Sequence, residues 1–457
     1  MSVFLLIILI IIEAGFATFE LTQQSLKSKW NIKKMMINII ELVVYLLMIF
    51  LPGIDLSFRF KGLLILLGLR ILISGIISLI QKNNKEIKKK FFTILGAVLS
   101  IILIALSLIP SFIITDYHGL ELTGEYDVRE CSAILTDLSR IEEFESDGSY
   151  REVPIHFYYP ENIEGIEEGT LPLIIFSHGA FGYYQSNTST YMELASHGYV
   201  VASLDHPYHS FFTKDTEGHT IIVDPEFFNS ALTIGNSDYD AISEEEIYEI
   251  TSKWMKLRED DMNFVIDTLI MTGTSQTIGA EWYLGETDED TILNVLKSIN
   301  YDKIGLMGHS LGGATAVTVG RRDDVSAVID LDGTMLGEEA GVDDGVVLFN
   351  EESYDTPLLS VVSEVHHESL GEYEEVGAIY VNSYVIDNAS EGFEVYFKDT
   401  DHMNFTDLPL ISPFLASNLG MGERDSKECI KSVNALVLRF FDCYLKDEGD
   451  FSCQECY

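Results

Sequence analysis

The pattern of apolar and polar residues divides the chain into two regions of different character. Up to about residue 115, long apolar stretches alternate with short polar segments. After residue 115, short β-rich runs alternate with longer runs of helical periodicity. The first pattern is typical of membrane-spanning helices, and the second is typical of an α/β domain. We therefore predict a transmembrane region at residues 1–115 and a globular domain at residues 116–457.

Four apolar stretches make up the first region, and each is about 18–24 residues long, enough to cross a bilayer as a helix. They lie at residues 2–19, 36–53, 62–80 and 91–114. The sequence thus predicts a bundle of about four transmembrane helices. A cleavable signal peptide is the alternative for residues 1–20. We reject it because no basic residue precedes the apolar run and no small-residue cleavage site follows it.

Basic residues in this region are concentrated in two loops, at residues 27–34 and 82–90. The loop between the second and third stretches carries only Arg59 and Lys61. By the positive-inside rule the two basic loops are cytoplasmic. This places the N-terminus and the globular domain on the outer side, so we predict a multi-pass protein of the cell membrane with an extracytoplasmic C-terminal domain.

Three charged residues, Glu13, Glu41 and Arg70, interrupt the apolar stretches, where a lone charge is costly. A buried Glu–Arg pair that holds the helices together explains them, and a functional polar site is the alternative. No transport function is predicted from them.

Eight candidate strands follow in the second region. They are Ser132–Arg140, Glu152–Tyr159, Pro172–Ser177, Tyr199–Leu204, Lys303–Met307, Val325–Leu331, Leu358–Val362 and Phe393–Lys398. The middle runs are continuously apolar, as expected for parallel strands that helices cover on both faces. A long insertion at about 206–300 separates the fourth and fifth strands. It contains a helical run at Ser243–Met271, which we interpret either as part of a lid or as an ordinary helix that covers the sheet.

A G-x-S-x-G pattern stands directly after the fifth strand, at Gly308–Gly312, and small residues with helical character follow it. This strand–turn–helix context is that of a nucleophile elbow, in which glycines leave room for a sharp turn around the serine. Ser310 is therefore the candidate nucleophile, and the backbone N–H of Leu311 is a candidate oxyanion donor. Eight strands with the serine after the fifth match the order of the α/β-hydrolase fold.

A serine hydroxyl needs a base, and in this fold the order along the chain is serine, acid, histidine. Three histidines follow Ser310: the adjacent pair at residues 366 and 367, and His402 directly after the last predicted strand. We favour His402 because its loop reaches the active-site edge of the sheet. The pair could flank the pocket or lie in a surface loop. The acid has two candidates, Glu364 after the seventh strand and Asp332 after the sixth, and spacing does not decide between them.

Residues from about 118 to 447 resemble the platelet-activating factor acetylhydrolase family of α/β-hydrolases. The matching segments are Leu173–Gly179 (LIIFSHG), Leu194–Val201 (LASHGYVV), Ile304–Thr315 (IGLMGHSLGGAT), Ile329–Gly333 (IDLDG), Pro357–Glu364 (PLLSVVSE) and His402–Asp407 (HMNFTD). The resemblance implies that Asp332 is the acid and that the Ala180 and Leu311 N–H groups form the oxyanion hole. It also implies hydrolysis of short-acyl phospholipids through an acyl-enzyme. A general carboxylesterase or lipase of cutinase or dienelactone-hydrolase type is an alternative, and a catalytically silent membrane sensor is another.

The charge of the second region limits the classes of partner and substrate that the chain can bind. Residues 1–115 contain 12 Lys and Arg against 5 Asp and Glu, whereas residues 116–457 contain 17 against 67. A domain as acidic as this repels phosphate, which excludes nucleic acid as a partner. As substrates, esters with anionic lipid headgroups are disfavoured relative to zwitterionic or neutral esters. No cofactor or metal is expected, since Cys453 and Cys456 lack a second ligand pair. The sequence makes no prediction of oligomeric state.

Overall fold

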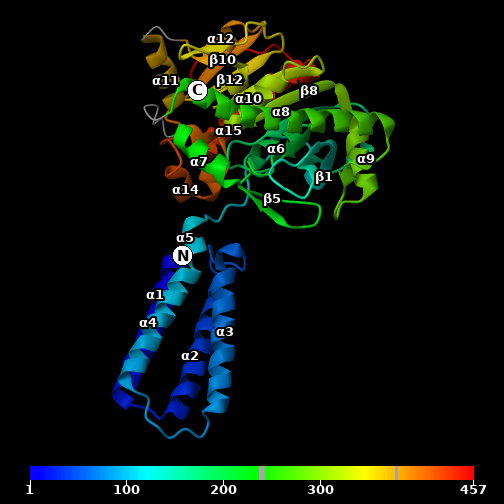
Figure 1. Cartoon of the computed structure of the whole chain (residues 1–457). Helices are drawn as coiled ribbons and strands as arrows, with labels where there is room; N and C mark the ends of the chain where they lie inside the picture. Colours follow the sequence, from blue (N-terminus) through cyan, green and yellow to red (C-terminus); the bar gives the residue numbers. More distant parts are fainter. Residues whose placement is uncertain (236–241, 376–378) are drawn as a thin grey trace. The chain divides into compact units, whose positions relative to one another are not determined.

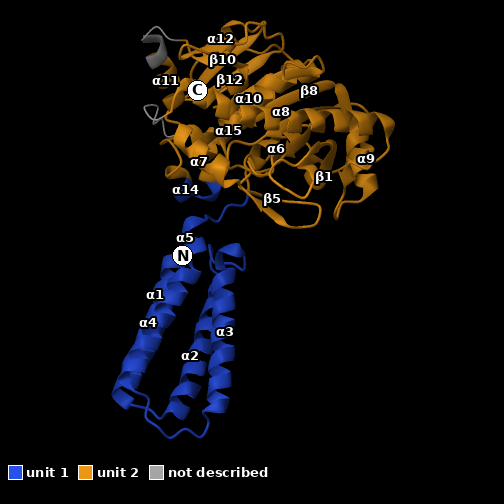
Figure 2. Ribbon diagram, viewed as in Figure 1, with its two compact units in different colours: residues 1–118, 410–415 blue, residues 119–409, 416–457 orange. Residues whose placement is uncertain are grey.

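The computed structural model describes residues 1–235, 242–375 and 379–457, apart from the side chains of residues 372–375. The chain divides into two compact units (Figure 2). The first comprises residues 1–118 with 410–415, and the second comprises residues 119–409 with 416–457. The sequence did not indicate that residues 410–415 join the first unit. There the backbone N–H of Thr115 donates to the carbonyl of Ile411 at 2.8 Å.

The first unit is a helical bundle (Figure 1). Its helices are α1 (Ser2–Gln23), α2 (Lys27–Met48), α3 (Phe58–Ile80), α4 (Lys90–Ser107) and α5 (Ile109–Ile113). Three of them, α1, α3 and α4, are long and apolar enough to cross a membrane. The fourth predicted stretch is split between α4 and α5, where Pro110 lies in the first turn of α5.

Helix α2 departs from the prediction. The apolar stretch was expected at residues 36–53, but the helix begins at Lys27 and ends at Met48, so it includes the lysines of the first basic loop. With those lysines and Glu41, α2 is not among the helices that are apolar enough to cross a membrane by length and composition. Length and composition therefore support three of the four predicted spans.

Two charged residues of α2, Lys34 and Glu41, are paired inside the bundle. Glu13 and Glu41 are fully buried, and Arg70 forms ion pairs with both, with 2.8 Å between its Nη1 and Oε2 of Glu41. Lys34 pairs with Glu13 at 2.5 Å. The expected buried Glu–Arg pair is thus present, and it belongs to a network of two carboxylates and two cations.

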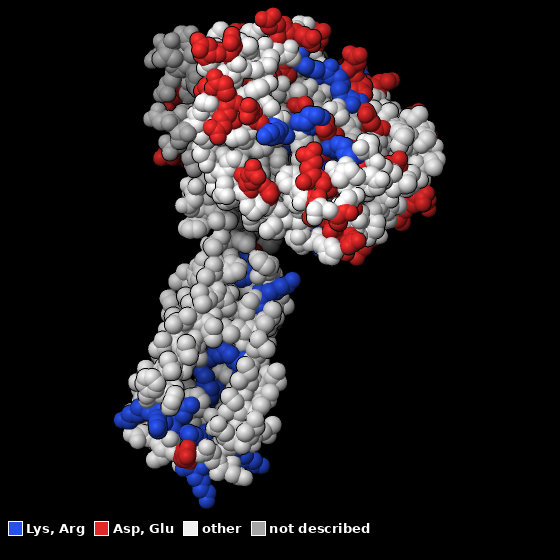
Figure 3. Space-filling model, viewed as in Figure 1, with Lys and Arg blue, Asp and Glu red and all other residues white. Residues whose placement is uncertain are grey.

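The two basic loops lie at the same end of the bundle. The backbone N–H of Lys27 donates to the carbonyl of Glu86 at 2.7 Å, which joins the loop after α1 to the loop after α3. Figure 3 shows Lys and Arg side chains gathered at this end of the bundle. At the other end, Ser2 Oγ donates to the carbonyl of Ser111 at 3.3 Å. Antiparallel helices joined in sequence require successive connections to lie at opposite ends of the bundle, as they do here.

The Arg70–Glu41 pair can be tested by exchanging its charges. Arg70→Glu leaves buried carboxylates unpaired, and breaking a buried pair costs about 3–5 kcal/mol, so we expect expression and thermal stability in detergent to fall sharply. Adding Glu41→Arg should restore a large part of both. Lys61→Glu, at an exposed position, is the control and should have little effect. A double variant no better than Arg70→Glu alone would contradict the pairing.

The second unit is built on a sheet of nine strands in its described part. They are β1 (Val128–Ile141), β2 (Tyr150–Pro160), β3 (Leu171–Ser177), β4 (Val200–Leu204), β7 (Trp282–Tyr283), β8 (Ile299–His309), β9 (Val325–Leu331), β12 (Leu358–Ser363) and β13 (Gly392–Phe397). Their order is β13-β12-β9-β8-β3-β4-β2-β1-β7. All neighbours from β13 to β4 are parallel, while β2, β1 and β7 are antiparallel.

All eight predicted strands are present, in the order of an α/β-hydrolase. The ninth, β7, is only two residues long, too short for periodicity to reveal. Alternate residues of the central strands pack on opposite faces, which explains their continuous apolar runs. In β3, for example, Leu173 lies in one core cluster and Ile174 in the other.

Helices cover both faces of the sheet (Figure 1). One core cluster contains residues of α8 (Glu244–Ser275), α9 (Glu289–Ser298), α10 (Leu311–Val319) and α12 (Val381–Asp387). The other contains residues of α6 (Thr188–Ser196) and α15 (Ser426–Lys446). The remaining elements of this unit include α11 (Glu364–Glu375) and the short pair β10 (Glu339–Asp343) and β11 (Val346–Phe349). Helices α13 (Leu408–Ile411) and α14 (Pro413–Ser417) lie partly in the first unit, which includes residues 410–415.

The predicted insertion contains α8, as expected, together with the hairpin β5 (Phe212–Lys214) and β6 (Thr220–Ile222) and helix α7 (Pro225–Gly235). Residues 236–241 of the insertion lie outside the described residues. Ser243 caps α8 by accepting from the N–H of Glu246 at 3.3 Å. Met262 and Leu269 in its second half belong to the core, so this half covers the sheet. Met255 in its first half packs instead in a small cluster with Leu311.

Candidate active site

The predicted site residues follow the carboxyl ends of parallel strands, which meet at one edge of such a sheet. Ala180 comes shortly after β3, Ser310 directly after β8, and Asp332 directly after β9. His402 follows β13, and Leu311 is the first residue of α10. The sheet thus brings together segments more than 200 residues apart in the sequence.

Ser310 occupies the sharp turn that the sequence predicted. Strand β8 ends at His309 and α10 begins at Leu311, so the serine between them has a strained backbone with φ of 55°. Glycine is required on either side. A Cβ at Gly308 would lie 2.1 Å from the carbonyl oxygen of Gly312, and a Cβ at Gly312 would lie 2.0 Å from that of Ser177. The strand–turn–helix elbow is confirmed.

Asp332 is hydrogen-bonded to His402, with 2.7 Å between Nδ1 of the imidazole and Oδ2 of the carboxylate. The carboxylate is buried, whereas the His402 side chain is 37% exposed. The other candidate acid, Glu364, accepts a hydrogen bond from the backbone N–H of Asp399 at 2.8 Å. Of the two candidates, Asp332 is therefore the one that contacts His402.

His309, the residue before the serine, holds the loop that carries His402. Its Nε2 lies 3.1 Å from the backbone carbonyl of His402, and the two rings are 4.5 Å apart. Burial lowers the pKa of His309 to about 3, so its ring is neutral and its Nε2–H donates this bond. Sequence reasoning missed this role because the variable positions of G-x-S-x-G carry no signal of their own.

The adjacent histidines lie in different surroundings. His366 contacts Asp332, with 3.1 Å between its Nδ1 and Oδ1. His367 stacks on the ring of Tyr396 with 4.0 Å between centroids. Burial of the Asp332 carboxylate opposes its ionisation, but the hydrogen bonds from two histidines outweigh this and hold the pKa of Asp332 well below its usual range. Asp332 is therefore ionised at neutral pH.

The loop after β3 lies against the serine. A Cβ at Gly179 would be 3.1 Å from the Cβ of Ser310. The carbonyl of Gly179 accepts from three groups: His178 Nδ1 at 2.6 Å, the N–H of Gly182 at 3.0 Å and Arg258 Nη2 at 3.4 Å. In a trans peptide the C=O and the following N–H point in opposite directions. The Ala180 N–H is thus held facing away from these donors.

Arg258 comes from α8 in the insertion, and its side chain is among the largest fully buried ones in the described part of the chain. Its Nη1 also donates to the carbonyl of His178 at 2.5 Å. The nearby Asp261 pairs with Arg140 and Arg151 instead. Burial lowers the pKa of Arg258 to about 9, so the side chain remains a cation at neutral pH. Its role could not be predicted from the sequence, because one arginine in an acidic helix resembles a surface residue.

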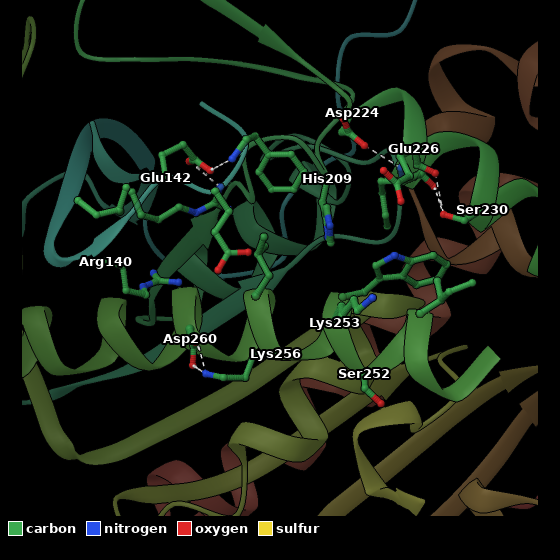
Figure 4. A pocket seen from close by; sticks show the side chains of 18 residues that line it. Arg140, Glu142, His209, Asp224, Glu226, Ser230, Ser252, Lys253, Lys256 and Asp260 are labelled. Atoms are coloured by element: carbon green, nitrogen blue, oxygen red, sulfur yellow. Dashed lines mark hydrogen bonds and ion pairs between the residues drawn. The ribbon is translucent and has the colours of Figure 1, made fainter. Parts of the chain in front are cut away.

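A pocket of about 950 Å³ is lined by residues of α7 and α8 in the insertion, together with Arg151 and residues 140–144. Figure 4 shows its polar groups, with Lys253 and Lys256 from α8 on one side and Asp224 and Glu226 at the start of α7. Its aromatic lining overlaps with the cluster around Leu311 through Phe227 and Trp254. Ser310 is not among the described residues that line the pocket. The two aromatic side chains therefore belong both to the pocket and to the cluster that contains Leu311, the residue after Ser310.

A metal site has no candidate in the part of the chain that the structure describes, where no group of three or more His, Cys, Asp or Glu side chains could hold an ion. The expectation that neither metal nor cofactor takes part stays a prediction.

The strand order and the serine elbow define an α/β-hydrolase. Residues 158–456 match the family described as platelet-activating factor acetylhydrolase, isoform II, which is well over half of the chain. The chain belongs to this family, which confirms the resemblance seen in the sequence.

Individual relatives are distant. Platelet-activating factor acetylhydrolase from Canis lupus familiaris is 29% identical over 158 residues, covering 32% of this chain and 31% of that protein. The protein of the same name from Gallus gallus is 24% identical over 297 residues, covering 61% and 63%. A ferulic acid esterase structure from Streptomyces cinnamoneus is 19% identical with a TM-score of 0.49, covering 72% of this chain and 93% of that one. The alignments with the two acetylhydrolases span less than two thirds of those proteins' own length.

Proposed function

We propose that this chain is a serine ester hydrolase that works through an acyl-enzyme on short-acyl phospholipids or related short esters. The observation that carries the proposal is Ser310 on a strained elbow, directly after His309, which packs on His402, together with the hydrogen bond between His402 and Asp332. Membership in the acetylhydrolase family supports the substrate class. A general carboxylesterase or lipase is the second candidate, since the same three residues would serve it equally.

His402 acts as the base in this proposal. Because its Nδ1–H donates to Asp332, the ring presents an unprotonated Nε2 toward substrate. Ser310 Oγ attacks the ester carbonyl carbon as Nε2 takes the hydroxyl proton. The tetrahedral intermediate collapses, and the leaving alcohol receives that proton. Water then attacks the acyl-enzyme by the same steps, releasing the acid and restoring Ser310.

The oxyanion is held by two backbone donors in this proposal, the N–H of Leu311 at the start of α10 and that of Ala180. The bonds from Arg258 and His178 to the Gly179 carbonyl fix the Ala180 peptide before substrate arrives. Donors oriented in advance stabilise charge without reorganisation, and one such donor is typically worth about 10²–10³ in rate.

We further propose that all four long helices cross the membrane, with the basic loops in the cytoplasm and the hydrolase unit outside. Helix α2 has 22 residues and is about 33 Å long, enough to span. Its charges Lys34 and Glu41 pair within the bundle rather than facing lipid. A membrane-bound enzyme of this kind would meet lipid esters at the bilayer surface.

The choice of acid predicts different losses for two carboxylates. Asp332→Asn removes the group that fixes the His402 tautomer, so kcat on a short aryl ester should fall about 10⁴-fold. Glu364→Gln, which changes a carboxylate bonded to backbone, should lower kcat by less than about tenfold. Equal losses in the two variants would contradict the assignment.

Arg258→Lys tests the support of the oxyanion hole. Lysine keeps a positive charge but lacks the fork that reaches two carbonyls. We expect kcat to fall about tenfold to a hundredfold with KM nearly unchanged, because the oxyanion forms only in the transition state. Arg129→Lys, at an exposed ion pair, is the matched control and should leave kcat unchanged. A raised KM with unchanged kcat in Arg258→Lys would argue against the role.

A panel of esters distinguishes the substrate classes. Full-length enzyme in neutral detergent should hydrolyse a zwitterionic phospholipid with an sn-2 acetyl group faster than its long-chain analogue. It should be slower on an anionic short-acyl phospholipid, because the domain carries 67 acidic against 17 basic residues. Preference for long-chain glycerides would favour the lipase alternative.

A further inference from the structure

The Asp332 carboxylate carries a second histidine that the proposed mechanism does not use. Its Oδ2 binds Nδ1 of His402 at 2.7 Å. Its Oδ1 accepts from the backbone N–H of Ser363 at 2.7 Å and binds Nδ1 of His366 at 3.1 Å. Both oxygens of the carboxylate are therefore engaged, and each has an imidazole on it.

The fold fixes His366 in this place. Strands β9 and β12 are parallel neighbours, with Leu331 opposite Val361, so both end at the same edge of the sheet. Helix α11 begins immediately after β12, and its first turn lies over Asp332. The backbone N–H of His366 donates to Ser363 Oγ at 3.1 Å. The side chain is only 14% exposed, and its ring meets Tyr380 edge-on at 5.7 Å.

Charged groups around His366 favour its cationic form. The titratable groups that face it from the packed elements are Asp330 in β9, Asp332 directly after β9, Glu394 on β13, Tyr380 before α12, and His402 after β13. Burial alone would lower the pKa of His366, but the hydrogen bond and charge of Asp332, aided by Asp330 and Glu394, raise it above its usual value. Burial raises the pKa of Asp330 well above its usual range, so Asp332 is the main anion here.

Two imidazoles on one carboxylate must influence each other. If both are protonated, two cations share one negative charge, and their repulsion opposes the second proton. The hydrogen bond and charge of Asp332 raise the pKa of His366 despite its burial, so we place the first proton on His366. The second must then enter a site that already holds a cation.

We propose that His366 is a positioning residue that shares Asp332 with His402 and, as a cation, keeps His402 neutral, and so able to act as a base, down to lower pH. The inference rests on the proposed function of Ser310, Asp332 and His402. The acidic limb of the pH profile of kcat/KM should therefore lie at lower pH than it would if residue 366 were neutral.

His366→Gln tests the proposal, because the glutamine amide can still donate to Oδ1 while the charge is gone. In full-length enzyme on a short aryl ester, we expect the acidic limb of kcat/KM to move upward by about one pH unit, the effect of removing a nearby charge at partial burial. His366→Arg keeps a permanent charge, so its limb should lie at or below that of the unmodified enzyme. His367→Gln, which removes an imidazole that does not contact Asp332, is the matched control and should leave the limb in place.

The results of these experiments distinguish failure of the inference about His366 from failure of the proposed hydrolase function. An acidic limb that stays in place or moves to lower pH in His366→Gln overturns the inference. A limb that moves to higher pH in His366→Arg also overturns it, and this second variant can be measured if His366→Gln does not fold. Absence of hydrolysis by the folded, unmodified enzyme overturns the proposed function and the inference with it. A merely structural role would lower the plateau or the stability without moving the limb.

Discussion

The carboxylate of Asp332 is the interaction on which the site depends. It is buried at the end of β9, accepts hydrogen bonds from two imidazoles and one backbone N–H, and belongs to a residue in a positive-φ conformation, with φ of 54°. These contacts come from the ends of three adjacent strands, β9, β12 and β13. An unpaired buried carboxylate would be costly, so the hydrogen bonds that orient the histidines also stabilise this edge of the sheet.

The insertion contributes to the same edge from outside the sheet. Half of α8 is an ordinary covering helix, with Met262 and Leu269 in the core. About one turn before Met262, Arg258 reaches the carbonyls of the loop after β3. One helix thus joins the hydrophobic core to the peptide that precedes Ala180. The hydrogen bonds from Arg258 to these carbonyls offset part of the cost of burying its charge.

The sequence predicted the parts of this molecule that depend on local pattern. Continuous apolar runs gave all eight main strands, and glycine spacing gave the elbow around Ser310, because both follow from short-range sterics. Contacts between distant segments were not predictable in the same way. Spacing left Glu364 and Asp332 equal, and the choice of Asp332 came only from the family resemblance. The contact between Asp332 and His402 depends on the register of β9 beside β12 and on the path of the loop after β13. Helix α2 was misjudged because its lysines resembled a loop, although Lys34 pairs with Glu13 inside the bundle.

The central claim is that Ser310 is an activated nucleophile, and covalent labelling tests it most directly. The full-length protein in detergent is treated with a fluorophosphonate, digested, and mapped by mass spectrometry, with Ser310→Ala as the matched control. The account predicts one adduct, on the peptide that contains Ser310, and none in the variant. A folded protein that stays unlabelled, or that is labelled on another residue to the same extent in Ser310→Ala, would contradict it.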